Sequence, residues 1–136
     1  MQNDNKQIVL NFIDAMGKGD VAAAAPCIAE DTFTLAKGFG KFAGVRTHDT
    51  ILATIGAFRK LMPAGMEPDI KTVIADGDKV VVEFVGNGVL ANGESYCNEY
   101  CMVFTLRAGR IRQVNGYVCT KLADEVLYPR LSAEGL

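Results

Sequence analysis

Four strand-like runs joined by very short turns occupy most of the sequence from Asp69 onward, and this feature constrains the fold most strongly. The runs cover residues 69–75, 79–90, 94–107 and 110–119. Turn residues stand at each junction: Asp76-Gly77, Asn92-Gly93 and Ala108-Gly109. Connections this short join neighbouring strands in antiparallel order, so the pattern predicts a four-stranded antiparallel meander. At 136 residues the chain has room for one domain, which we expect to span residues 1–136.

The first half of the sequence has the periodicity of helices. Apolar side chains recur at helical spacing over residues 2–16, and Gly17-Lys18-Gly19 ends that pattern. Asp20 is a favourable N-cap for a second, alanine-rich helix to about Ala29, which Pro26 should kink or split. The segments that follow are a short strand over 32–36, a glycine-rich loop over 38–44 and a third helix over 48–62.

This order of elements predicts an α+β fold. We expect a cone-shaped roll in which a curved, mostly antiparallel sheet wraps around three N-terminal helices. The interior of such a roll is apolar and suits a small molecule, and 49% of the residues are hydrophobic. The net charge of −2 argues against a nucleic-acid partner. No apolar run reaches the roughly 20 residues of a membrane span, so we expect no membrane partner.

The N-terminal residues are polar and lack the order of charges and apolar residues that marks a signal peptide. We therefore expect a cytoplasmic protein with reduced cysteines at positions 27, 97, 101 and 119. Cys97 and Cys101 are four residues apart on one predicted strand, which separates their Cα atoms by roughly 13 Å, too far for a disulfide. A single histidine cannot build a multi-histidine site, and we expect no metal or other cofactor.

Several short phrases of the sequence are typical of a known family. They are Gly19-Asp20, Ala29-Glu-Asp-Thr32, Asp76-Gly-Asp-Lys-Val-Val-Val82, Tyr96-Cys-Asn-Glu-Tyr100, Ala108-Gly-Arg-Ile111 and Asn115-Gly-Tyr-Val-Cys119. With the order of elements, they resemble the nuclear transport factor 2-like superfamily, and within it the SnoaL-like and ketosteroid-isomerase-like proteins. The resemblance covers roughly residues 5–127 and implies the cone-shaped fold. It does not imply one activity, since this fold hosts isomerases, cyclases, dehydratases, hydrolases and binding proteins.

The catalytic positions of ketosteroid isomerases are substituted in this sequence. The resemblance places Phe12 where those enzymes have a hydrogen-bonding tyrosine on the first helix. It places Ala36 at the position of their general-base aspartate and Cys101 at that of their protonated acid. An enolising mechanism needs a base and donors aimed at the enolate oxygen, and these three side chains do not supply them.

Two further sets of family positions are also substituted. Limonene-epoxide-hydrolase-like members have an arginine and two aspartates where the resemblance places Phe84, Gly86 and Gly116. Many SnoaL-like relatives end in Glu-Tyr-x-Asp, and this sequence has Gly116-Tyr-Val-Cys119 instead. Positions that carry polar cavity side chains in the relatives thus carry apolar or small residues in this sequence.

The match at Cys101 also determines which face of the third meander strand we expect inside. Alternation separates residues 97, 99, 101 and 103 from residues 96, 98, 100, 102 and 104. If Cys101 occupies the acid position, the odd-numbered residues face the cavity. Glu99 is then the only carboxylate on a predicted cavity strand and a candidate general acid or base. The alternatives are a rim carboxylate paired with Arg or Lys, or one turned outward by a register slip.

Cys101 is a candidate nucleophile only if a base or a positive charge activates it, and otherwise it is a small buried hydrophobe. The side chains that we expect to contact a ligand are Phe12, Met16, Leu35, Phe58, Phe84, Val103, Val114 and Val118. The opposite sheet face would expose an apolar stripe of Tyr96, Tyr100, Phe104 and Tyr117 that needs a cover. The resemblance implies a homodimer through this outer sheet face.

Two functional hypotheses follow, and the sequence leaves open whether the protein is an enzyme. The first is a small-molecule cavity protein that binds an apolar ligand. The second is an isomerase, cyclase or lyase-type enzyme that uses Glu99 as general acid or base on an apolar, carbonyl-bearing substrate. The glycine-rich loop over 38–44 is either a flap at the cavity mouth, with Phe39 and Phe42 as apolar lids, or an ordinary surface loop.

Overall fold

The computed structural model describes residues 2–136, with side chains from residue 4 onward. The N-terminal part forms helix α1 (Gln2–Lys18), the short helix α2 (Val21–Ala24) and the 3-10 turn η1 (Ala25–Cys27). The next elements are β1 (Ile28–Ala36), β2 (Gly44–Thr47) and α3 (His48–Leu61). The meander consists of β3 (Met66–Asp76), β4 (Lys79–Val89), β5 (Ser95–Arg107) and β6 (Arg110–Val118). The chain ends in α4 (Thr120–Leu122), the π-helical turn η2 (Ala123–Leu127) and α5 (Tyr128–Ala133).

Local sequence signals explain the boundaries of the N-terminal helices. Gly19 has a φ of +67°, a conformation that lets the chain leave α1 at little steric cost. The carboxylate of Asp20 caps α2, because it accepts a hydrogen bond from the backbone N–H of Ala23 (3.1 Å). Pro26 stands at the start of η1 and splits the second helix, as predicted.

The six strands form one mixed, unclosed sheet in the order β2-β1-β6-β5-β4-β3. The predicted antiparallel meander is confirmed for β3 to β6. β1 pairs with β6 in parallel and with β2 in antiparallel order. Strand β2 was not predicted, because its four residues follow a glycine-rich segment and show no clear alternation. The α+β cone fold is otherwise the expected one.

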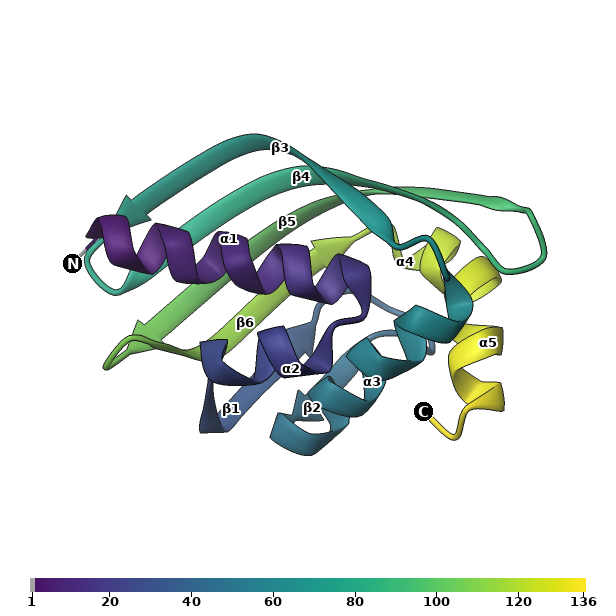
Figure 1. The fold of residues 1–136 in the computed structure, drawn as a ribbon, viewed down its shortest axis with the longest axis horizontal. Helices are drawn as coiled ribbons and strands as arrows, with labels where there is room; N and C mark the ends of the chain where they lie inside the picture. Colours follow the sequence, from purple (N-terminus) through teal and green to yellow (C-terminus); the bar gives the residue numbers. More distant parts are fainter. Residues whose placement is uncertain (1) are drawn as a thin grey trace.

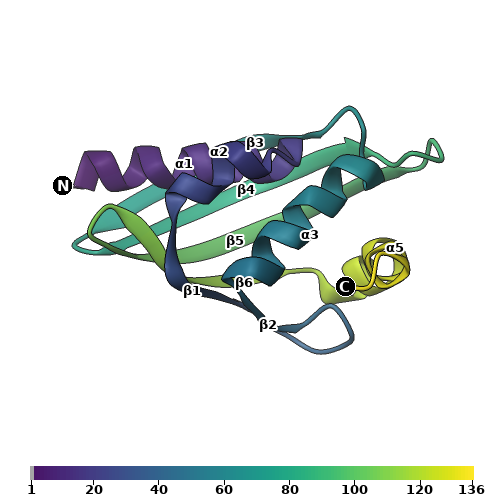
Figure 2. The same cartoon turned by 60° about the horizontal axis from the view of Figure 1, so that its bottom comes forward.

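The helices α1, α2 and α3 lie over one face of the curved sheet, and the C-terminal segments lie at one end of it (Figures 1 and 2). α1 runs along β3, while α3 crosses near β1 and β2 (Figure 2). The opposite, outer face of the sheet is left without a helix in both views. Among residues 2–136, no helix combines the length and the hydropathy that a bilayer crossing requires.

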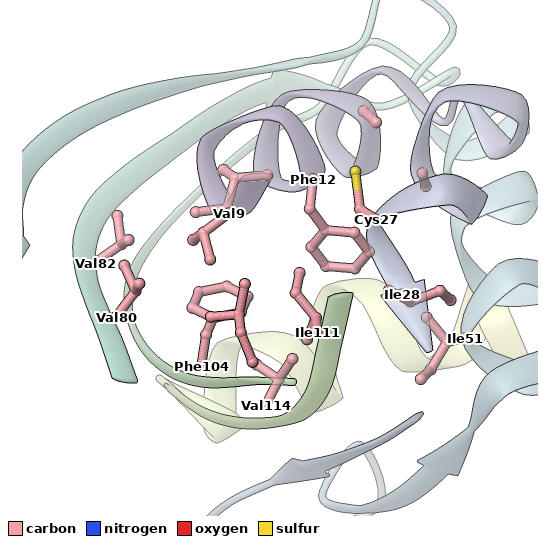
Figure 3. Packing of buried hydrophobic residues seen from close by; sticks show 14 of the residues in the cluster. Val9, Phe12, Cys27, Ile28, Ile51, Val80, Val82, Phe104, Ile111 and Val114 are labelled. Carbon is pink, nitrogen blue, oxygen red and sulfur yellow. The ribbon is translucent and has the colours of Figure 1, made fainter. Parts of the chain in front are cut away.

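Two groups of buried side chains hold the helices to the sheet. The larger group lies between α1, η1 and the meander, where the rings of Phe12 and Phe104 meet edge to face at 6.3 Å (Figure 3). The smaller group joins the end of α3 to the C-terminal helices and includes Met62, Tyr96 and Leu131. Burial of side chains this large is the main source of the stability of such a domain.

Candidate functional site

An apolar cavity of about 130 Å³ lies where the two buried groups meet. α1 and α3 contribute one wall, β1, β5 and β6 contribute another, and the loop before β2 closes one side. Most of the lining side chains are aliphatic, aromatic or methionine: Phe12, Met16, Leu35, Phe42, Ile51, Ile55, Phe58, Met62, Met66, Met102, Val114, Val118 and Leu127. The remaining polar side chains are few, as is typical of small-molecule sites.

Six of the eight residues expected to contact a ligand line this cavity: Phe12, Met16, Leu35, Phe58, Val114 and Val118. Leu35 is among them although it lies opposite Asn115, which is on the outer face. Phe84 and Val103 are not. Phe84 is buried behind the lining, where its ring stacks on that of Tyr100 at 4.7 Å. Val103 lies on the outer face of the sheet, because it alternates along β5 with the fully buried Phe104.

The predicted orientation of β5 is wrong by one residue. Phe84 of β4 lies directly opposite Tyr100, and Val114 of β6 lies directly opposite Phe104. Since residues opposite one another share a sheet face, the even-numbered residues of β5 point inward. Alternation defined the two faces but could not say which was inside, and one family position was not enough to decide it.

The reversal removes both proposed catalytic side chains from the cavity. Glu99 is exposed on the outer face, and its neighbour Cys101 is half-buried on the same face. Burial, followed by the negative charge of Glu83, raises the pKa of Cys101, so neither effect favours a reactive thiolate. The acid–base and nucleophilic roles assigned to these residues therefore have no support from the geometry.

The predicted apolar stripe for a dimer interface is wrong for the same reason. Tyr96, Tyr100 and Phe104 face inward and belong to the buried groups or pack against them. Only Tyr117, with 47% of its surface exposed, lies on the outer face.

A small hydrogen-bonded network occupies the inner face at the start of β5. The buried amide of Asn98 donates from Nδ2 to the hydroxyl of Tyr96 (2.9 Å) and to the carbonyl oxygen of Cys119 (3.2 Å). The hydroxyl of Tyr100 donates to Sδ of Met66 (3.8 Å), and Tyr96 is its titratable neighbour. Both phenols line the cavity, so the network places hydroxyl groups in an otherwise apolar wall.

Burial raises the pKa of Tyr100 well above its usual value, and the neighbouring Tyr96 adds to the effect. Burial also raises the pKa of Tyr96. Both side chains therefore remain protonated donors. Our sequence interpretation missed them because it placed them outside. Tyr96, Tyr100 and Phe104 place three aromatic rings on one face of the strand. This clustering is the sequence signal that could have identified the inner face.

Arg46 is the charged side chain of the cavity lining, among the residues whose side chains are described. It lies on β2 opposite Thr34 of β1, and both residues line the cavity. Its guanidinium stacks over the ring of Phe42 at 4.6 Å, and its Nη2 donates to the carbonyl oxygen of Phe42 (3.1 Å). Nothing in the sequence around Arg46 distinguished it from a solvated surface residue.

The glycine-rich loop over 38–44 is tied to the C-terminal segment by Asp124. The two carboxylate oxygens of Asp124 accept hydrogen bonds from the backbone N–H groups of Lys41 (2.9 Å) and Phe42 (2.7 Å). Phe42 lines the cavity, whereas Phe39 is 91% exposed. The loop therefore contributes one of its two phenylalanines to the wall.

Comparison with known proteins identifies the family. The sequence model of the SnoaL-like domain family matches residues 9–114. An NTF2-like protein from Burkholderia xenovorans is 22% identical, with 93% of this chain and 97% of that one covered and a TM-score of 0.74. An LEH-like epoxide hydrolase from M. tuberculosis is 19% identical, with 97% of this chain and 95% of that one covered and a TM-score of 0.76. TerC, co-crystallized with polyporic acid, is 17% identical, with 90% of this chain and 97% of that one covered and a TM-score of 0.73.

No curated protein matches the chain. The solved structures share its fold at identities too low to carry an activity across. The match to the domain model extends over most of the sequence and includes the second half of α1, all of α3 and the greater part of the sheet. The chain therefore belongs to the family of SnoaL-like domain proteins.

Proposed function

We propose that this protein binds a small apolar molecule that carries one hydrogen-bond acceptor. The observation that supports the proposal is the apolar cavity with the hydroxyl groups of Tyr96 and Tyr100 in its wall. Its volume of about 130 Å³ is close to the roughly 150 Å³ of engineered apolar cavities that bind benzene. A ligand with a single ring is therefore the natural occupant.

Binding accounts for the lining better than catalysis does. The titratable side chains of the described lining are tyrosines and one arginine, which hold their protons near neutral pH. They can donate hydrogen bonds to a ligand oxygen, but none of them is poised to remove a proton from carbon. TerC, which has a similar fold, was co-crystallized with polyporic acid, and this agrees with a binding role for a cavity of this kind.

Acetophenone is a suitable probe, because it joins one ring to one carbonyl acceptor. We expect the wild-type protein to bind it in isothermal titration calorimetry. A Cβ built at Gly116 meets only the carbonyl oxygen of Leu35 at 3.9 Å, so Gly116→Leu should extend into the cavity without backbone strain. This variant should lose binding, while Asn115→Leu, which changes the neighbouring residue on the outer face, should keep it.

Substitution of the proposed donor gives a second arm of the same experiment. Tyr100→Phe removes one hydroxyl and should weaken acetophenone binding by about two- to tenfold, the usual worth of one neutral hydrogen bond. Binding by the wild type that Gly116→Leu leaves unchanged would contradict the cavity as the site. A wild type that binds neither acetophenone nor ethylbenzene would contradict the proposed function.

We also propose that two copies associate through the outer sheet face, with different residues from those predicted. The face includes Val81, Cys101, Val103 and Tyr117, in neighbouring positions on β4, β5 and β6. Two sheets packed face to face would cover this partly apolar surface.

The four cysteines are free and two are exposed, which suits the reducing cytoplasm.

A further inference from the structure

We propose that the ligand is an anion, specifically a small aromatic monocarboxylate whose carboxylate pairs with Arg46 while its ring occupies the cavity. This inference rests on the proposed function and adds the charge of the ligand to it. It follows from the position of Arg46, from the absence of a protein counter-charge for it within the described residues, and from the size of the space beside it.

Arg46 belongs to the inner side of the sheet. It lies opposite Thr34, which in turn lies opposite Val114, and all three line the cavity. The side chain is half-buried, and the ring of Phe42 lies against the guanidinium at 4.6 Å. The ring and the carbonyl oxygen of Phe42 thus hold the charge at the cavity.

The protein supplies little to balance this charge. A guanidinium has five N–H donors, and the one hydrogen bond found for Arg46 goes to the carbonyl oxygen of Phe42. Within the described side chains, the other partly buried arginines have acidic partners: Arg112 pairs with Asp31, and Arg130 lies near Glu94. None of the ion pairs found among these residues includes Arg46.

The acidic side chain that contacts the same loop is already engaged. Asp124 accepts hydrogen bonds from the N–H groups of Lys41 and Phe42, one with each carboxylate oxygen. Burial lowers the pKa of Arg46 and outweighs the opposing effect of the nearby Tyr128, which reflects the cost of holding a cation there without a carboxylate partner. A bound carboxylate would offset this cost through two parallel N–H···O hydrogen bonds, the geometry that a guanidinium fits best.

The charge and size of the site favour a monocarboxylate over other anions. One arginine balances one negative charge, whereas a phosphate monoester would bring up to two. The cavity of about 130 Å³ accepts one ring, so the apolar part is that of a benzoate rather than of a fatty acid or a polycyclic compound. The hydroxyl of Tyr100 donates only to the weakly accepting sulfur of Met66, so it can turn to a polar substituent on the ring.

Isothermal titration calorimetry with benzoate and its neutral isostere benzamide tests this inference. The wild type should bind benzoate at least tenfold more tightly than benzamide. Arg46→Met keeps an apolar stem but removes the charge, so it should reduce benzoate affinity at least tenfold and change benzamide affinity less than about twofold. Arg46→Lys keeps the charge and should fall between, since an ammonium cannot form the bidentate pair. Arg110→Met, at the exposed β5–β6 turn, is the matched control and should bind both as the wild type does.

Circular dichroism and the melting temperature establish that each variant is folded, and Arg46→Lys keeps the test available if Arg46→Met is not. Equal affinity of the wild type for benzoate and benzamide would overturn the inference. So would an Arg46→Met variant that still prefers benzoate. If acetophenone binds in the cavity but benzoate does not, only the anionic ligand is contradicted. If acetophenone and ethylbenzene also fail to bind, the proposed function fails as well.

Discussion

At the scale of single residues, Gly17 determines how closely α1 approaches the start of β3. A Cβ built on Gly17 would lie 2.3 Å from the carbonyl oxygen of Met66, far inside normal contact distance. Met66 also lines the cavity, and its Sδ accepts a hydrogen bond from the hydroxyl of Tyr100. The absence of a side chain at Gly17 therefore sets the position of a residue in the cavity wall.

Gly17→Ala is expected to lower the free energy of unfolding by about 2 kcal/mol or more, because the clash is with backbone and cannot relax by rotation of a side chain. In most helices the same change stabilises by up to about 1 kcal/mol. Gly56→Ala on α3 is the matched control, since its Cβ would meet only Val21 at 3.4 Å. Urea denaturation checks both, and a Gly17→Ala variant as stable as Gly56→Ala would contradict the close approach.

Tyr100 gives the molecule a predictable response to alkaline pH. Its pKa is raised in the folded state, so the stability it contributes is complete below the unfolded value of about 10 and is lost as the pH rises toward the folded value. We expect the wild type to lose stability above that pH and Tyr100→Phe to lose less. Denaturation curves measured across this range, with tyrosinate absorbance followed in parallel, make the comparison. Parallel declines for the two proteins would show that Tyr100 is not buried as described.

At the scale of elements, β5 shows how far a sequence determines structure. The alternation and the turn residues were sufficient to place β5 and its neighbours within a few residues. They did not determine the face, because apolar residues occur on both sides of β5: Phe104 on one and Val103 on the other. The pairing with β4 and β6 decides it, and that pairing is a tertiary property.

The same limit explains the candidate site. Phe12, Phe58 and Val114 could be predicted from apolar periodicity on elements that were correctly placed. Tyr96 and Tyr100 could not, because a one-residue error in the strand exchanges the two faces. The position of Arg46 depends on the pairing of β2 with β1. The position of Phe42 depends on the contact between the loop and Asp124, which joins segments more than 80 residues apart.

The loop over 38–44 owes its position to Asp124. Asp124→Ala removes the acceptor for two backbone N–H groups, so hydrogen exchange at Lys41 and Phe42 should accelerate by about tenfold or more, as expected for hydrogen bonds to a charged group. Glu125→Ala changes the adjacent, exposed acid and should leave those rates unchanged. Exchange measured by nuclear magnetic resonance resolves the two amides. Equal rates in wild type and Asp124→Ala would mean that the carboxylate does not hold the loop.

At the scale of the whole molecule, the cone has two differently built surfaces. The concave side is filled by helices except at the cavity, and the outer side has no helix over it (Figures 1 and 2). The outer face includes charged Glu83 and Glu99 beside Val81, Val103 and Tyr117. This mixture is compatible with a solvated monomer that can associate, which is the pattern of many homodimers.

Val103→Glu is expected to dissociate the proposed dimer, because it would place an unpaired charge near the centre of the interface in each copy. Sedimentation velocity at a series of concentrations should detect a dimer for the wild type and a monomer for Val103→Glu. Val21→Glu, on α2 and away from the outer face, should leave the dimer intact. A wild type that sediments as a monomer at every concentration would contradict the proposed interface.

The cavity between the two buried groups is the proposed ligand site. Intermolecular nuclear Overhauser effects between bound acetophenone and methyl-labelled protein test it most directly. We expect contacts from the ring protons to methyl groups on the lining, namely Val114, Val118 and Leu127, and their loss in Gly116→Leu. Contacts instead to the outer-face methyl groups of Val81 and Val103, or binding with no contact to the lining, would contradict it.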